Sequence, residues 1–306
     1  MSRRLTRVPT ALPSKYFTYV VTSITWGCSF IFIKLSLDFL TPFGVAFGRC
    51  FFGALTLLTI ARVRNISLPP FGAVWGRLLL VALCINVLPG ILFAVAETRT
   101  TTILASIINA LVPLTSLFFI TVVFRDERIT RQQELGLAVG FGGVLMAFGV
   151  WQGLGRNPWW AVGALLTAVT LYGVTFPYIR RHITPLGLHP VALSATQLVL
   201  SVVVLAPTFL LDGLNGHGIT VRGAVAIAVL GTFSSGLAFM WNFRTIQLLG
   251  PSTASTVTYW SPLVATIVGI VFLREQLVWF QPVGAAIVLL GSAISQNRLP
   301  RFGRGR

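Results

Sequence analysis

The sequence predicts an all-α integral membrane protein with ten transmembrane helices, arranged as two inverted five-helix repeats. Three observations lead to this fold class: long apolar runs, an uneven distribution of Lys and Arg, and an internal repeat. Of the 306 residues, 55% are hydrophobic and 10% are charged, whereas a soluble domain usually carries about 25% charged residues. So few charges cannot cover a water-facing surface. The lipid bilayer is therefore the first partner that the sequence implies.

Charged residues divide the chain into ten apolar windows. A helix needs about 20 apolar residues to cross the hydrocarbon core of a bilayer. The windows of that size are 16–33, 39–61, 78–96, 100–124, 135–155, 157–179, 190–211, 223–243, 245–273 and 276–297. The first run lacks a small-residue cleavage site, so we expect it to remain in the protein as a signal anchor.

Lys and Arg are concentrated in alternate loops. If the N-terminus is cytoplasmic, 17 of these cations lie inside and 5 lie outside, as the enrichment of cytoplasmic loops in Lys and Arg requires. We therefore expect a multi-pass protein of the inner (cytoplasmic) cell membrane. Its basic ends, residues 1–15 and 298–306, would both be cytoplasmic. Because the cations flank apolar runs, the net charge of +16 does not point to nucleic acid as a partner.

The two halves, residues 16–151 and 159–297, carry the same pattern. At an offset of 148 residues, VVFRDERITRQQELG aligns with IVFLREQLVWFQPVG, and at 146 residues TWGCSFIFIK aligns with LYGVTFPYIR. Because each half has an odd number of predicted spans, the second copy enters the membrane from the opposite side. An inverted repeat is the architecture expected of a secondary transporter.

Short motifs recur in both halves. They comprise Trp26, Gly27, Phe30, Lys34, Pro42, Arg49, Pro113, Glu127 and Gly136 in the first half, and Pro262, Glu275 and Gly284 in the second. Over roughly residues 18–297 the chain resembles the EamA family of the drug/metabolite transporter superfamily. The resemblance implies ten helices, with both termini cytoplasmic. It also implies a central cavity lined mainly by helices 1, 3, 4, 6, 8 and 9, while helices 5 and 10 serve as scaffold. Family members mostly export small metabolites, amino acids prominent among them. Glu97 and Pro177 depart from the family pattern.

Arg49 lies near the middle of the second predicted span. Placing Arg at the bilayer centre costs at least about 2.5 kcal/mol, so this side chain should face protein or water. It either meets an anionic group of a substrate in the cavity, or hydrogen-bonds carbonyls at helix ends. Its counterpart at an offset of 148 is Gln197.

Two aromatic pairs recur at the same spacing. Trp26 and Phe30 lie on one face of the first predicted helix, and Tyr172 and Phe176 repeat the pattern in the sixth. As cavity lining, these rings would suit an apolar or aromatic substrate. The alternative is that they fill space between helices.

Several polar and indole side chains fall within apolar windows. Amides and indole N–H groups need hydrogen-bond partners in lipid, so we expect them to face inward, towards a substrate or towards one another. These candidates are Asn86, Asn109, Trp241, Asn242, Tyr259 and Trp260.

Glu97 is the acidic residue closest to the apolar length of a span. It is the first candidate for a proton relay if transport is proton-coupled. However, Arg99 is near, and the loop is expected to be wet. These two features favour a surface anchor instead.

Gly136, Gly140 and Gly143 recur at three- and four-residue spacing in the fifth window. Small residues at this spacing allow close helix approach, either inside one chain or in a homodimer.

The sequence therefore predicts a secondary transporter, an exporter of small metabolites such as amino acids or related compounds. The alternatives are a membrane channel and a membrane-embedded lipid-modifying enzyme. A channel would need a repeated filter or a ring of pore charges, and an enzyme would need a His/Asp/Glu cluster or an activated Ser or Cys. Neither is visible in the sequence. The three cysteines lie in apolar runs and the three histidines are scattered, so we expect no metal and no cofactor.

Overall fold

The computed structural model describes residues 15–124, 130–149, 158–249, 254 and 256–295. In these ranges the regular structure is helical, apart from one isolated antiparallel bridge between Leu40 and Leu214. The predicted basic tails, except for Lys15, and the motif residue Glu127 lie outside the described residues.

Both halves are built from long helices, several of which are interrupted at equivalent places. The first half contains α1 (Lys15–Ser36), α2 (Pro42–Val63), α3 (Ala73–Ala82), η1 (Leu83–Val87), α4 (Leu88–Glu97), α5 (Thr102–Asn109), α6 (Val112–Phe118), η2 (Phe119–Val123) and α7 (Arg131–Phe148). The second half contains α8 (Trp159–His182), η4 (Thr184–Leu186), α9 (Pro190–Asp212), α10 (Val221–Val229), η5 (Leu230–Leu237), α11 (Ala238–Leu249), η6 (Thr256–Trp260), α13 (Ser261–Leu273) and α14 (Phe280–Ser295).

Among the described residues, seven helical stretches are long and apolar enough to cross a membrane. They are Phe17–Ser36, Pro42–Val63, Ala73–Glu97, Thr102–Val123, Trp159–Leu186, Pro190–Asp212 and Val221–Leu248. Each overlaps a predicted window, and the last also extends into the window 245–273. The other three windows hold helices that are more polar or shorter. α7 begins with the polar run RQQE, and α13 and α14 are shorter apolar helices. The window 245–273 was drawn too long, because α11 ends at Leu249 and α13 begins at Ser261.

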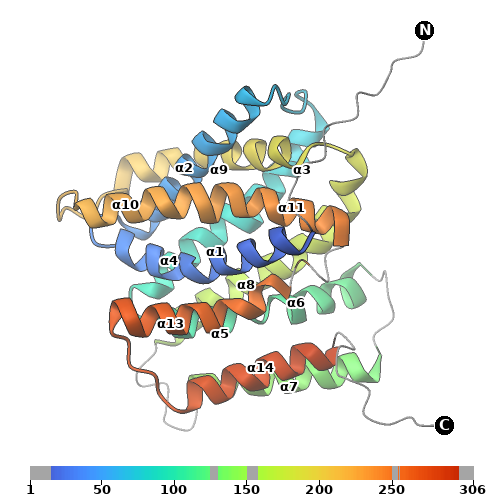
Figure 1. Cartoon of the computed structure of the whole chain (residues 1–306), viewed down its shortest axis with the longest axis vertical. Helices are drawn as coiled ribbons and strands as arrows, with labels where there is room; N and C mark the ends of the chain where they lie inside the picture. The colour runs from blue at the N-terminus through green and yellow to red at the C-terminus, as the bar shows by residue number, and fades with distance from the viewer. Residues whose placement is uncertain (1–14, 125–129, 150–157, 250–253, 255, 296–306) are drawn as a thin grey trace.

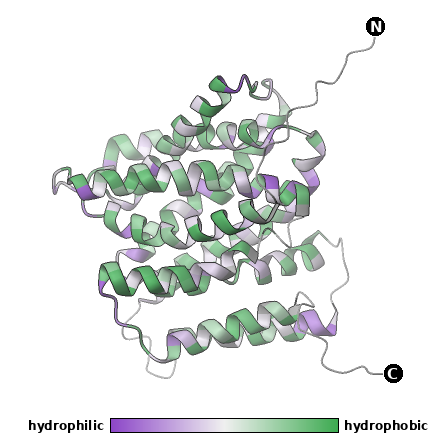
Figure 2. Cartoon of the chain, in the orientation of Figure 1, coloured by the Kyte–Doolittle hydropathy of each residue, from purple (hydrophilic) through white to green (hydrophobic). Residues whose placement is uncertain are grey.

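The long helices run side by side in one bundle, with α7 and α14 along one edge (Figure 1). The start of α1 and the end of α14 lie at the same end of this bundle. Apolar residues follow the helices, while hydrophilic ones gather near helix ends and loops (Figure 2). Large apolar side chains such as Leu55, Val203 and Ile267 are exposed. A surface of this kind suits contact with lipid.

Two spans are broken at equivalent prolines. α5 ends at Asn109, and α6 begins at Val112 with Pro113 in its first turn. In the second half the 3₁₀ helix η6 gives way to α13, with Pro262 in its first turn. Proline has no N–H to donate to the preceding turn and clashes with its carbonyl, so the first turn of a helix is where it fits without strain, as at these two breaks.

Two other spans carry π-helical segments at matching positions. η1 lies between α3 and α4, and η5 lies between α10 and α11. A π-helical turn inserts an extra residue and shifts the side chains that follow it, which is why such turns often occur at functional sites. Here they precede the parts of α4 and α11 that face the centre of the bundle.

α7 and α14 pack backbone against backbone through glycines. A Cβ atom on Gly143 would lie 2.6 Å from the backbone nitrogen of Val288, and one on Gly291 would lie 2.3 Å from that of Gly140. The two helices are antiparallel, because Gly143 meets Gly284 while Gly291 meets Gly136. The glycines therefore serve a contact inside the chain. The homodimer stays a prediction.

We expect Gly143→Ala to lower the melting temperature, because the added methyl group would overlap the backbone of α14. Overpacking of this kind usually costs about 1–3 kcal/mol. Gly142 is the matched control, because a Cβ there meets no atom within 4 Å, and alanine favours a helix by about 1 kcal/mol over glycine. Gly142→Ala should therefore leave the melting temperature unchanged or raise it. Thermal unfolding of the detergent-solubilised protein, followed by tryptophan fluorescence, measures both variants. Equal melting temperatures would contradict this account of the crossing.

Candidate functional site

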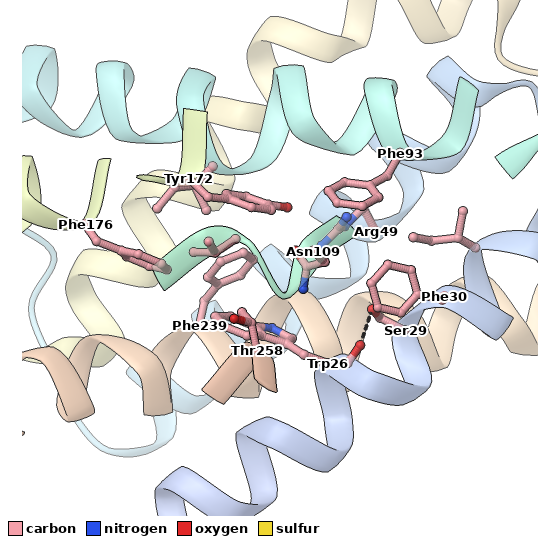
Figure 3. A pocket seen from close by; sticks show the side chains of 13 residues that line it. Trp26, Ser29, Phe30, Arg49, Phe93, Asn109, Tyr172, Phe176, Phe239 and Thr258 are labelled. Carbon is pink, nitrogen blue, oxygen red and sulfur yellow. Dashed lines mark hydrogen bonds between the residues drawn. The ribbon is translucent and has the colours of Figure 1, made fainter. Parts of the chain in front are cut away.

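A cavity lies between the two halves and is lined from both of them (Figure 3). Side chains from α1, α2, η1, α4, α5 and α6 meet side chains from α8, α11 and η6. None of the lining residues comes from α7 or α14. The lining residues are Trp26, Ser29, Phe30, Ile33, Arg49, Ile85, Phe93, Asn109, Val112, Tyr172, Phe176, Phe239 and Thr258.

The aromatic lining repeats between the halves. The ring of Trp26 lies 5.5 Å from that of Phe239, and the ring of Tyr172 lies 6.0 Å from that of Phe93. Tyr172 and Phe239 follow Trp26 and Phe93 by the same 146 residues. The contact between α1 and α11 therefore has an equivalent between α8 and α4, with the roles of the two halves exchanged. Phe30 adds a third ring, 5.8 Å from Phe93.

The helix breaks place polar groups in the same cavity. Asn109 ends α5, and Thr258 lies in η6 just before α13. They are 149 residues apart, which is also the spacing of Pro113 and Pro262. Asn109 is buried, and Figure 3 shows its amide directed towards the centre of the cavity. Irregular backbone at membrane depth is tolerated where it lines a cavity.

Arg49 is the charged group of the cavity lining. Its side chain is 5% exposed, and its Nε donates a hydrogen bond of 2.8 Å to the Oγ of Ser235. The hydroxyl of Tyr172 points towards it (Figure 3). Within the described part of the chain, no carboxylate forms an ion pair with this guanidinium. The sequence suggests carbonyls at helix ends as possible partners of Arg49. The partner in the structure is a serine hydroxyl instead.

The π-helical segment η5 holds both Arg49 and α1. The indole nitrogen of Trp26 donates to the carbonyl of Ser234 over 3.1 Å, and the hydroxyl of Ser234 donates to the carbonyl of Thr25 over 3.1 Å. The neighbouring Ser235 accepts the bond from Arg49. This short stretch of the second half therefore positions two cavity residues of the first.

Other candidates from the sequence lie away from the cavity. Asn86 is buried, and its Nδ2 donates to the Oγ of Ser201 over 3.2 Å. Gln197 is buried on α9 and, among the described residues, its amide has no hydrogen-bond partner. Trp241 and Asn242 lie on α11 without lining the cavity, and Trp260 is half exposed. The side chain of Tyr259 lies outside what the structure describes.

Sequence reasoning missed several lining residues. The phenylalanine pair Phe93 and Phe239 carried a usable signal, because Gly90 and Phe93 align with Gly236 and Phe239 at the offset already found for helices 1 and 6. Small or apolar lining residues such as Ser29 and Ile33 carry no comparable signal. They resemble any other side chain in an apolar span.

Glu97 is not the solvated surface anchor that its neighbour Arg99 suggested. It is the last residue of α4 and has no exposed surface. Neither carboxylate oxygen accepts a hydrogen bond from a described residue. The Nζ of Lys34 lies beside it, but donates to the backbone carbonyls of Glu97 and Thr100.

Glu275 lies at the same end of the bundle and has a structural role. Its carboxylate accepts hydrogen bonds from the backbone N–H and the hydroxyl of Thr102, at 2.8 and 2.7 Å, and from the N–H of Ile103 at 3.2 Å. A carboxylate satisfies the free N–H groups of a helix start and interacts favourably with the helix dipole. A residue of the second half thus caps α5 of the first.

Comparison with known proteins gives one consistent result. The sequence profile of the EamA-like transporter family matches residues 14–149 and again residues 159–295. YedA, an uncharacterized inner membrane transporter of Escherichia coli (strain K12), is 24% identical over 247 residues, which cover 80% of this chain and 78% of that protein. An uncharacterized transporter of Archaeoglobus fulgidus is 25% identical over 287 residues, which cover 90% of this chain and 96% of that protein. A solved crystal structure with 16% sequence identity covers 94% of this chain and 99% of its own, with a TM-score of 0.69.

We expect Glu275→Gln to lower the free energy of unfolding by about 1–2 kcal/mol, because it removes the charge from the cap of α5. Glu134→Gln is the control. Glu134 is an exposed carboxylate in the first turn of α7, so its loss should have little effect. Chemical denaturation in detergent measures the difference. A Glu275 variant as stable as the control would show that the cap contributes nothing.

Proposed function

Because the chain belongs to the EamA-like transporter family, we propose that it is a secondary transporter that exports small metabolites, such as amino acids or related compounds, by alternating access. The family profile covers both halves of the chain, and the cavity lies between these halves. A site at the interface of two repeats can be exposed to either side when the repeats move relative to each other.

We assign the membrane architecture as ten helices in two inverted repeats. The antiparallel crossing of α7 and α14 supports inversion, because Gly136 meets Gly291 while Gly143 meets Gly284. Each pair exchanges equivalent positions at an offset of 148. Such reciprocity is expected when a two-fold axis perpendicular to the helices relates the two halves. Because the helices cross the membrane, this axis would lie in the membrane plane, as it does for inverted repeats.

The orientation rests on two supports. The start of α1 and the end of α14 lie at the same end of the bundle. The excess of Lys and Arg is on that side, which assigns it to the cytoplasm. Lys34, Glu97 and Glu275 would then lie at the periplasmic or outer end.

Arg49 is the observation that carries the substrate assignment. A buried guanidinium needs an anionic or strongly polar partner, and among the described residues its hydrogen bond goes to the hydroxyl of Ser235. The rings of Trp26, Phe93 and Tyr172 surround the remaining space. A small metabolite with a carboxylate and an apolar or aromatic body would satisfy both parts of the lining, and amino acids with apolar side chains meet this description.

The alternatives to a transporter are a channel and a membrane-embedded enzyme. A carrier exchanges labelled for unlabelled substrate across a membrane faster than it moves substrate in one direction, whereas a channel gains nothing from substrate on the far side. An enzyme would need clustered acid–base or nucleophilic groups. The cavity instead presents one cation, amide and hydroxyl groups, and aromatic rings.

A metabolite screen tests the proposed function. Cells that overproduce the protein should release one or a few small carboxylates faster than cells that lack it, because a carrier adds a path across the membrane. Mass spectrometry of the medium measures this release. An identical metabolite profile in both cell types would contradict the exporter assignment.

We expect Arg49→Gln and Arg49→Lys to reduce that release at least about tenfold. A hydrogen bond to a charged group contributes about 1.5–3 kcal/mol, and lysine cannot reproduce the planar fork of a guanidinium. Arg222→Gln is the control, because Arg222 is exposed at the start of α10. The abundance of each variant in the membrane is measured alongside. Wild-type release by both Arg49 variants would exclude a role in substrate binding.

A further inference from the structure

The carboxylate of Glu97 is buried without a hydrogen-bond donor. The residue has no exposed surface, and both of its carboxylate oxygens lack partners among the described residues. Burying an ionised carboxylate in this way is strongly unfavourable. The arrangement therefore suits the protonated acid, whose charge has been removed.

Its charged neighbours are already engaged. Lys34 on α1 donates to two backbone carbonyls at the end of α4, those of Glu97 and Thr100. Glu275, from the segment between α13 and α14, is satisfied by the start of α5. Arg49 on α2 is the remaining charged group that acts on Glu97, and it bonds Ser235. Of the two carboxylates, Glu97 is the one without a hydrogen-bond donor among the described residues.

Packing does not explain an acid at this position. At an offset of 146, the residue equivalent to Glu97 is Phe243, which is also buried. The residue equivalent to Lys34 is Arg180, which is exposed. The fold therefore accepts an apolar ring at this site. The pairing of a buried acid with a lysine is particular to one end of the bundle.

The same pair is one helical turn from the cavity. Phe30 precedes Lys34 by four residues on α1, and Phe93 precedes Glu97 by four residues on α4. The two phenylalanine rings contact each other and line the cavity. A shift of α1 against α4 at Lys34 would therefore reach the lining.

Resting on the transport function above, we propose that Glu97 binds the proton that drives transport, and that its protonation state decides whether this end of the bundle stays closed. When the carboxylic acid loses its proton to water, the new carboxylate attracts the ammonium of Lys34. Lys34 then leaves the carbonyls of Glu97 and Thr100, and the connection from α4 to α5 loosens. Reprotonation restores the closed arrangement. Because Glu275 of the second half caps α5, the proton acts on a contact between the halves.

Amide exchange tests this proposal without a substrate. The N–H groups of Thr102 and Ile103 report on this end, because both donate to Glu275. Hydrogen–deuterium exchange of the full chain in lipid nanodiscs, corrected for intrinsic rates, should show at least about tenfold less protection at pH 8 than at pH 5. Glu97→Gln mimics the protonated acid and should stay protected at both values.

Two further variants make the exchange result decisive. Asp38→Asn should respond to pH as the native chain does, because Asp38 is an exposed carboxylate just beyond α1. Lys34→Gln removes the group that moves and should abolish the response. No response in the native chain, or an unchanged response in Glu97→Gln or Lys34→Gln, would overturn the proposal.

Flux measurements test whether the proton drives transport. In proteoliposomes with radiolabelled phenylalanine as the probe, Glu97→Gln should keep exchange across the membrane but lose accumulation driven by a pH gradient. Accumulation at the native level in this variant would overturn the proposal. If the native chain exchanges no probe, the substrate class is at fault, and amide exchange still decides the role of Glu97.

Discussion

Backbone that enters the hydrocarbon of a bilayer must find its hydrogen-bond partners inside the protein, and this requirement governs where the chain can depart from regular helix. Most of these departures lie beside the cavity. The breaks before Pro113 and Pro262 place residues in the central cavity, and η1 and η5 precede the parts of α4 and α11 that line it. Much of the irregular backbone is thus gathered where the two halves meet, whereas the π-helical η2 carries exposed apolar side chains at the end of its span.

Many features of the cavity occur in equivalent pairs, one from each half, whereas its charged group occurs once. The aromatic contacts occur twice, as do the proline breaks and the polar groups beside them. Arg49 has no such counterpart, because Gln197 is buried away from the lining. Glu97 is likewise matched by a phenylalanine. A symmetric cavity would bind a ligand equally from either side, so any difference in binding between the two sides requires residues that occur only once.

The sequence predicted well what depends on repetition and hydropathy. Seven of its apolar windows coincide with helices long enough to span, and the offsets between the halves identified Trp26, Phe30, Tyr172 and Phe176, which line the cavity. It failed where a single sequence carries no spatial information. A glutamate beside an arginine and a loop resembles a solvated anchor, and only the packing of α1, α4 and α5 shows that Glu97 is enclosed. The window 245–273 is wrong for a similar reason, because the charge at Arg244 lies inside α11, which continues to Leu249, and no charge separates Leu249 from α13.

The helices that do not line the cavity explain how the lining can change. α7 and α14 meet through glycines whose missing side chains let backbone lie directly on backbone. Sliding one helix along the other would bring neighbouring side chains into atoms that are already in contact, so this crossing resists movement.

The cavity helices, by contrast, are interrupted by prolines and π-helical turns, where backbone angles can change at lower cost. In the proposed transport cycle, motion of one half against the other would therefore be concentrated on the side of the bundle that holds Arg49 and Glu97. At the Glu97 end the polar contacts are those of Lys34 with two carbonyls and of Glu275 with the start of α5. A close-packed edge beside interrupted helices is what the proposed two-state carrier needs from a single chain.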